Sequence, residues 1–146
     1  MSKAIVTATP ADWDLGPEVV PIIPSWILSG APVTHVKNVL RSHDSTCDLA
    51  IWECNAGSFN WHYGQDETVV IVSGEVFVTI ENGEERRLGP GDLAFFPAGS
   101  SSRWRVPVHV RKIAVLRETW WRPLGLGLRA WKKLLRIVGV GRRAPF

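Results

Sequence analysis

Short runs in which hydrophobic and polar residues alternate occupy most of the chain, and such runs are typical of β-strands with one buried face. Between residues 25 and 116 these runs are separated by turn-forming residues. The predicted strands cover residues 26–28, 34–40, 47–53, 59–63, 68–72, 75–80, 84–88, 93–96, 103–106 and 108–116. Ten short strands without helices between them predict an all-β fold, either an antiparallel sandwich or a barrel.

Turns and an N-terminal arm complete this pattern. Asn82-Gly83 supplies the positive φ angles of a two-residue hairpin loop. Residues 88–92 predict a second tight turn, in which Gly91 follows the fixed φ angle of Pro90. Residues 1–24 contain four prolines and predict an extended arm that wraps the body.

The last part of the chain has a helical period. Its apolar residues recur at steps of four and three, which places them on one face of an α-helix. They are Leu124, Leu128, Trp131, Leu135 and Val138, with Arg129, Lys132, Lys133 and Arg136 over much of the remaining surface. Residues 139–141, which include two glycines, end this helix. The chain is therefore divided into an arm (1–25), a barrel (26–120) and a basic amphipathic tail (121–146).

Two interpretations of the predicted helix stay open. Its apolar face covers the barrel or a dimer seam, or it lies on an anionic membrane surface through residues 124–138. A cationic helix that contains Trp suits such a surface. The apolar stripe alone does not separate these possibilities.

Composition and charge limit the classes of function that we expect for this chain. With 146 residues and 45% hydrophobic residues, the chain has the size and core of one domain. Residues 122–146 carry seven Lys and Arg and no acid, which leaves ten bases against fourteen acids in residues 1–121. The body has no basic face, so we expect no nucleic-acid partner. Two cysteines and an N-terminus without an apolar run predict a cytoplasmic protein, with peripheral membrane attachment as the alternative.

Two spacings in the body suggest a family. Six residues separate Glu67 from Gly74, and five residues separate Gly91 from Pro97, with Gly99 two positions after Pro97. In this order they resemble the two signature motifs of the cupin superfamily. The resemblance implies a single-domain double-stranded β-helix, a conical jelly-roll barrel, here with an N-terminal extended arm and a C-terminal amphipathic helix.

Longer segments are similar to the small single-domain cupins grouped with ureidoglycine aminohydrolase. They cover residues 51–54, 57–63, 66–68, 89–93, 95–99 and 110–112, together with Trp104. The resemblance extends over residues 26–116 and implies a homodimer, because small cupins commonly pair through their sheet edges.

The metal ligands of catalytic cupins are poorly matched. The family binds a divalent metal through two His and a Glu of the first motif and a His of the second. Counting back from Glu67, those first-motif His positions fall on Trp61 and Tyr63, or on Asn60 and His62. The second-motif position is Ser102. We therefore expect no resident metal or other cofactor, and the weak alternative is a site that keeps only His62 and Glu67.

The resemblance implies an inward-facing set of residues in place of the metal. Glu67 and Lys112 are the candidate catalytic pair, as acid and base, or else a structural ion pair. The candidate ligand-binding residues are Trp61, Tyr63, Ser102, Trp104 and Cys54. For the aromatic residues the alternative is core packing, and for Cys54 it is a small buried apolar residue.

Three functions follow from this set. The first is a small-molecule-binding cupin that holds, or acts on, a small polar metabolite without a metal. The second is a metal-dependent hydrolase like ureidoglycine aminohydrolase. The third is a non-catalytic sensor or scaffold, peripheral on a membrane through its C-terminal helix.

Overall fold

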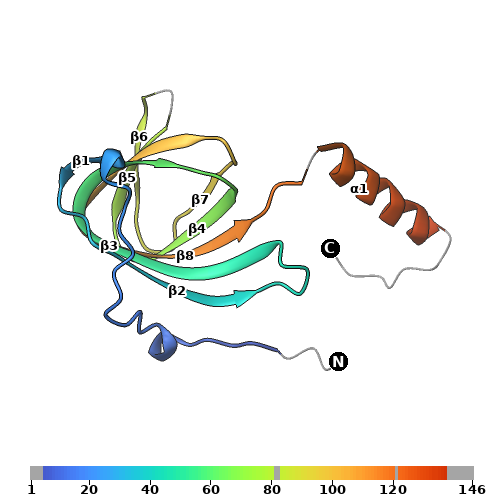
Figure 1. Ribbon diagram of the computed structural model, residues 1–146, viewed down its shortest axis with the longest axis horizontal. Helices are drawn as coiled ribbons and strands as arrows, with labels where there is room; N and C mark the ends of the chain where they lie inside the picture. Colours follow the sequence, from blue (N-terminus) through green and yellow to red (C-terminus); the bar gives the residue numbers. More distant parts are fainter. Residues whose placement is uncertain (1–4, 81–82, 121, 138–146) are drawn as a thin grey trace.

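The computed structural model describes residues 5–80, 83–120 and 122–137, which form eight strands, two short 3-10 turns and one α-helix (Figure 1). The 3-10 turns are η1 (Pro10–Asp12) and η2 (Pro24–Trp26). The strands are β1 (Ile27–Gly30), β2 (Thr34–Arg41), β3 (Cys47–His62), β4 (Asp66–Gly74), β5 (Val76–Thr79), β6 (Glu85–Leu88), β7 (Leu93–Phe96) and β8 (Ser101–Arg117). The helix is α1 (Arg122–Ile137).

Two long strands organise the fold. β3 and β8 pair antiparallel over their whole length, from Cys47 opposite Arg117 to His62 opposite Ser101 (Figure 1). One half of this ribbon extends through β2 on one side and through β4 and β7 on the other. The other half extends through β1 and through β5 and β6. The result is an antiparallel jelly-roll barrel, which confirms the predicted fold class.

Each long strand was predicted as two short ones, and this was wrong. The residues that suggested breaks are Asn55 to Gly57 in β3 and Pro107 in β8, and the strand pairing shifts by one residue where they meet. An irregularity of this kind accepts a proline that has no N–H to donate, and it bends the strands without ending them. Gly57 is required there, because a Cβ at this position would lie 2.8 Å from Cβ of Pro32. The other predicted strands agree with the structure to within two residues.

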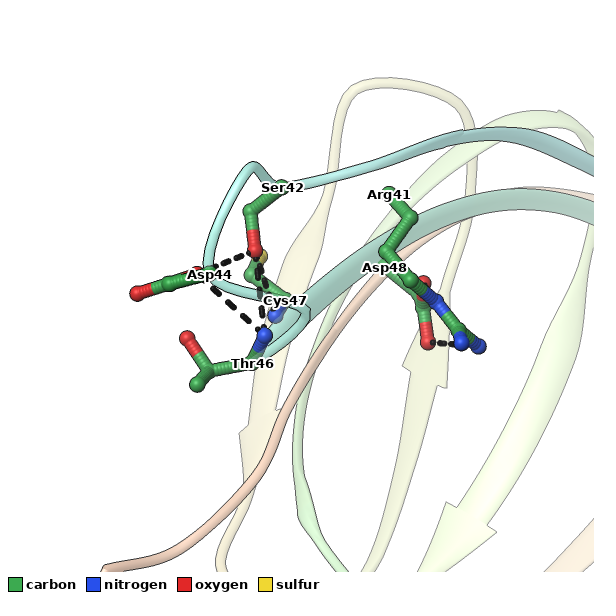
Figure 2. A network of polar contacts seen from close by, with 6 residues as sticks. All are labelled: Arg41, Ser42, Asp44, Thr46, Cys47 and Asp48. Carbon is green, nitrogen blue, oxygen red and sulfur yellow. Dashed lines mark hydrogen bonds and ion pairs between the residues drawn. The ribbon is translucent and has the colours of Figure 1, made fainter.

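The turn between β2 and β3 is held by side chains (Figure 2). The Ser42 hydroxyl donates to Oδ1 of Asp44 at 2.6 Å and accepts the backbone N–H of Cys47 at 2.9 Å. Asp44 also accepts the backbone N–H of Thr46. The hydrogen bond from the Ser42 hydroxyl is the main reason why the pKa of Asp44 falls to about 2. These contacts fix the hairpin that aligns β2 with β3.

The two turns predicted at glycines are both present. The β5–β6 hairpin closes between Ile80 and Glu84, where the N–H of Ile80 donates to the carbonyl of Glu84 at 3.3 Å. Gly83 has a φ of +81°, and residues 81–82 lie outside the described part of the chain. In the second turn Gly91 has a φ of +88°, and the Asp92 carboxylate accepts the N–H of Gly89 at 2.8 Å.

The segment before β1 lies against the outside of β2. The N–H of Val20 donates to the carbonyl of Thr34 at 2.9 Å, and the Thr34 hydroxyl donates back to the Val20 carbonyl. Nζ of Lys37 donates to the carbonyl of Asp12 at 2.5 Å. Ile22 is buried in the core. These contacts match the predicted extended arm.

The interior of the barrel is filled by apolar and aromatic side chains. Its largest fully buried side chains are Trp104, Phe59, Ile51, Ile71, Val69, Val76, Val110, Thr34 and Cys54. Besides Thr34, the buried polar or charged residues among those described are Glu67, Ser102 and Lys112. All three belong to the candidate site predicted from the sequence.

Helix α1 follows the predicted apolar period, and Val138 and residues 139–141 lie outside the described part of the chain. It lies beyond the end of β8, away from the strands (Figure 1). Leu124, Leu128 and Trp131 are each more than half exposed. The barrel of the same chain therefore does not cover its apolar face. Within residues 5–80, 83–120 and 122–137, no helix is long and apolar enough to cross a membrane.

Candidate functional site

An ion pair lies inside the barrel. Nζ of Lys112, on β8, donates to Oε1 of Glu67, on β4, at 2.6 Å. Their side chains are 3% and 7% exposed. Since an unpaired charge at this depth is costly, each side chain needs the other as its partner. The structure thus brings the two predicted catalytic residues into direct contact.

Three tryptophan rings surround the ammonium group of Lys112. Nζ lies 4.6 Å from the ring centroid of Trp104, 4.7 Å from that of Trp52 and 5.8 Å from that of Trp61. The faces of aromatic rings attract a cation, and most strongly where water is excluded. The Glu67 carboxylate and the tryptophan rings together replace the water that Lys112 loses.

A second polar cluster joins Tyr63, Ser102 and Trp104. The Tyr63 hydroxyl lies 2.7 Å from Oγ of Ser102, and Nε1–H of Trp104 donates to both oxygens at 2.9 and 3.0 Å. The ring of Tyr63 stacks on Phe96 with its centroid at 4.5 Å. Burial raises the pKa of Tyr63, so the phenol stays protonated at neutral pH. These hydroxyls therefore act as hydrogen-bond donors and acceptors.

Cys54 is fully buried in the core, and its thiol lies 3.2 Å from the carbonyl oxygen of Asn55. Burial raises the pKa of Cys54 to about 12, against a smaller opposing effect of the Lys112 charge. A neutral, buried thiol is a poor nucleophile. The structure supports the alternative in which Cys54 is a small buried apolar residue.

The residues of this interior do not fit a divalent metal. The Glu67 carboxylate is held by an ammonium group, which would repel a second cation. His62 is exposed, with Nδ1 2.6 Å from Oγ of Ser101, so it does not join Glu67 in the interior. No group of three or more His, Cys, Asp or Glu side chains in the described part of the chain could hold a metal ion. The structure therefore does not bring His62 and Glu67, the alternative pair of ligands, together.

A pocket of about 480 Å³ opens between the free edges of β6 and β7. Its lining includes Val78, Ile80, Leu88, Leu93, Ala94, Phe95, Phe96 and Pro97, with Arg86 and Ser100 to Ser102 as polar members. Leu93 is 69% exposed and Phe95 57%. We call this the mouth pocket. Ser102 is the one residue of the predicted set that lines it.

The predicted site is thus divided into two parts. Glu67, Lys112, Trp61 and Trp104 enclose the interior ion pair, while Ser102 links the interior to the mouth pocket. Sequence reasoning missed Trp52 as a wall, although its position two residues before Cys54 places both on one strand face. It also missed the pocket. The signal was β7 itself, whose four residues are all apolar, so that both faces of an edge strand lack polar side chains.

Comparison with known proteins agrees with this architecture. Residues 41–114 match the family model described as the EutQ-like cupin domain. No curated protein matches the chain.

Three solved structures are similar in fold. A Salmonella typhimurium protein, named as a candidate ethanolamine utilization protein Q, is 27% identical with a TM-score of 0.52, covering 58% of this chain and 69% of that one. The Clostridium difficile EutQ protein is 24% identical with a TM-score of 0.55, covering 70% and 83%. A Pseudomonas syringae protein of unknown function is 22% identical with a TM-score of 0.60, covering 70% and 46%.

The family model covers half of the chain and includes all of β3 and most of β8, the strand that carries Lys112 and Trp104. The finer resemblance to ureidoglycine aminohydrolase is not among these matches and stays a prediction. The jelly-roll fold, its interior and the family match together show that the chain belongs to the EutQ-like cupin domain family.

Proposed function

We propose that this cupin binds a small molecule with an apolar body and one polar or acidic end, and that the ligand occupies the mouth pocket. The observation that carries the proposal is the position of Ser102, a residue of the pocket wall whose hydroxyl belongs to the buried polar cluster. The interior is filled by the ion pair and its tryptophan rings. A ligand more apolar than the polar metabolite predicted from the sequence suits the pocket walls.

The hydrogen bonds around Ser102 leave one donor free. Tyr63 and Ser102 have one hydroxyl hydrogen each, and only one of these can lie between their oxygens. Trp104 donates to both and accepts nothing. If Tyr63 donates to Ser102, the hydrogen of Ser102 can point into the pocket that it lines. A ligand with an acceptor at its deep end would receive this hydrogen bond.

The pocket also offers a positive charge at its rim. Arg86 lines the pocket and pairs with Glu84 at 3.1 Å, with both side chains more than half exposed. Exposed pairs of this kind contribute little, so Arg86 can exchange Glu84 for an acidic group of a ligand at low cost. The apolar walls contributed by Leu93, Ala94 and Phe95 would bury the rest of the molecule.

The surroundings of Glu67, Lys112 and Ser102 favour binding over turnover at these three residues. Glu67 and Lys112 hold each other in the interior and are not part of the pocket wall. The partners of the Ser102 hydroxyl are a phenol and an indole, neither of which is a general base at neutral pH. A nucleophilic serine needs such a base beside it, and among the serines of the pocket wall it is Ser101 that has one, since its Oγ lies 2.6 Å from Nδ1 of His62.

Anilinonaphthalene sulfonate tests this proposal, because it has apolar rings and a single acidic group. We expect the full chain to enhance its fluorescence with saturable binding at the pocket. Ala94→Trp fills the pocket and should weaken this binding by at least about tenfold, which corresponds to the loss of ~1.4 kcal/mol. Val108→Trp adds the same side chain at an exposed barrel position that does not line the pocket, and should leave the affinity unchanged.

Leu93→Asp is the second variant, because Leu93 is exposed and its replacement should not prevent folding. Circular dichroism and thermal unfolding verify that each variant is folded. If folded Ala94→Trp and Leu93→Asp both bind the dye as the parent chain does, the mouth pocket is not the ligand site.

A further inference from the structure

Helix α1 presents two chemically distinct faces. With 3.6 residues per turn, Leu124, Leu128, Trp131 and Leu135 fall within an arc of about 60°. Arg129, Lys132 and Lys133 fall on the opposite side, within an arc of about 100°. A helix with such faces usually buries the apolar one against a partner.

The rest of the chain, as far as the structure describes it, does not supply that partner. Leu124 is 51% exposed, Leu128 51% and Trp131 59%. A row of large apolar side chains on a helix is a poor surface to leave in water. Something outside the described part of this chain is expected to cover it.

The charge of the helix limits what this partner can be. No Asp or Glu occurs after Glu118, whereas residues 122–146 contain seven Lys and Arg. A second copy of the helix would bring more positive charge beside Lys132 and Lys133, with no acid in the segment to pair with it. An anionic surface neutralises the same charges.

We propose that α1 lies in the surface of an anionic lipid membrane and attaches the cupin barrel to it. The leucines and Trp131 would enter the boundary between headgroups and acyl chains, and the basic face would contact acidic headgroups. An indole suits that boundary, because it joins an apolar ring to a hydrogen-bond donor. This proposal does not depend on the function of the mouth pocket.

Vesicle co-sedimentation of the full chain tests the proposal. Vesicles of phosphatidylcholine alone are compared with vesicles that also contain phosphatidylglycerol, at low and at high salt. We expect binding to the anionic vesicles at least about tenfold stronger than to the neutral ones at low salt, because each base near an anionic surface contributes a factor of about five. High salt should remove most of this difference.

Three variants test separately how the apolar face and the basic face of α1 contribute to vesicle binding. Trp131→Glu should abolish binding to both kinds of vesicle, and the double variant Lys132→Glu/Lys133→Glu should lose the preference for anionic ones. Val108→Glu places the same acid on an exposed barrel position and should bind as the parent chain does. All of these positions are exposed, so thermal unfolding should be unchanged.

Two results would overturn the proposal. One is that the parent chain ignores anionic vesicles at low salt. The other is that Trp131→Glu leaves vesicle binding intact but converts a dimer to a monomer in size-exclusion chromatography, which would assign the apolar face to a second copy of the chain.

Discussion

Nζ of Lys112 lies 2.6 Å from Oε1 of Glu67 inside the barrel, so one buried charge answers the other. The ammonium group supplies one positive charge where the sequence lacks metal-binding histidines, and the Trp104 and Trp52 rings complete its surroundings. Because Lys112 is part of β8, the chain itself supplies the positive charge that faces Glu67. Its charge and that of Glu67 balance within the fold.

Removing one partner of this pair should be costly. In Glu67→Gln the ammonium group of Lys112 stays buried without a countercharge, and breaking a buried pair costs about 3–5 kcal/mol. Urea unfolding followed by circular dichroism measures the loss. A loss below about 1 kcal/mol would mean that water reaches Lys112, contrary to its burial.

Removing both partners should cost far less. The double variant Glu67→Leu/Lys112→Met leaves no buried charge, and well-packed apolar replacements of buried pairs are often neutral or stabilising by about 1–4 kcal/mol. If this variant also keeps dye binding at the mouth pocket, the pair is structural. A folded double variant that no longer binds the dye would give Glu67 or Lys112 a part in ligand binding.

The two cysteines should differ sharply in reactivity. Cys54 is fully buried, whereas Cys47, at the start of β3, is partly exposed. At neutral pH the native chain should therefore react with dithionitrobenzoate at one thiol, and the chain unfolded in guanidinium at two. Cys47→Ser should suppress the native reaction. Rapid reaction of native Cys47→Ser would contradict the burial of Cys54.

The sequence predicted the interior part of the candidate site better than the pocket at the surface. Motif spacing predicted five residues of the interior, because glycines and a proline at fixed intervals mark the ends of the strands that carry them. These residues are Glu67, Trp61, Tyr63, Ser102 and Trp104. The partnership of Glu67 with Lys112 could be foreseen, since charges buried on facing strands must pair.

What the sequence could not predict depends on strand neighbours. The mouth pocket forms because β6 and β7 do not pair with each other, and no local pattern shows which edges stay free. The sequence also could not show that β3 continues past Asn55. This continuity requires Pro107 of β8 to lie where the pairing of β3 with β8 shifts by one residue. The predicted homodimer stays a prediction.

Stability should fall in alkaline solution in a way that depends on Cys54. Its pKa is about 12 in the folded chain against 9.0 for an ordinary thiol, so between these values the unfolded chain loses a proton that the native chain keeps. The contribution is fully present below pH 9 and is lost as the pH rises toward 12, by at most about 1.4 kcal/mol per pH unit. Tyr63, whose pKa is also raised by burial, acts in the same direction.

Cys54→Ala should therefore show a shallower loss of stability above pH 9 than the parent chain, whatever its stability at pH 7. Cys47→Ser is the matched control, since it keeps Cys54. The measurement is the free energy of unfolding from urea titrations at a series of pH values. Identical alkaline slopes for Cys54→Ala and the parent chain would show that the native thiol ionises freely.

Gly74 tests whether the motif glycines are needed for backbone geometry alone or also for close packing. It has a φ of +70°, and a Cβ there would overlap the carbonyl oxygen of His109. Gly74→Ala should cost about 3–5 kcal/mol, because left-handed strain adds to a clash with backbone that cannot move aside. Gly91→Ala is the control: its φ is +88°, but no atom lies within 4 Å of the added Cβ, so only the strain of ~1 kcal/mol applies. Equal losses in thermal unfolding would show that β8 shifts to admit the methyl group, and that the contact between Gly74 and His109 does not fix the position of β4 against β8.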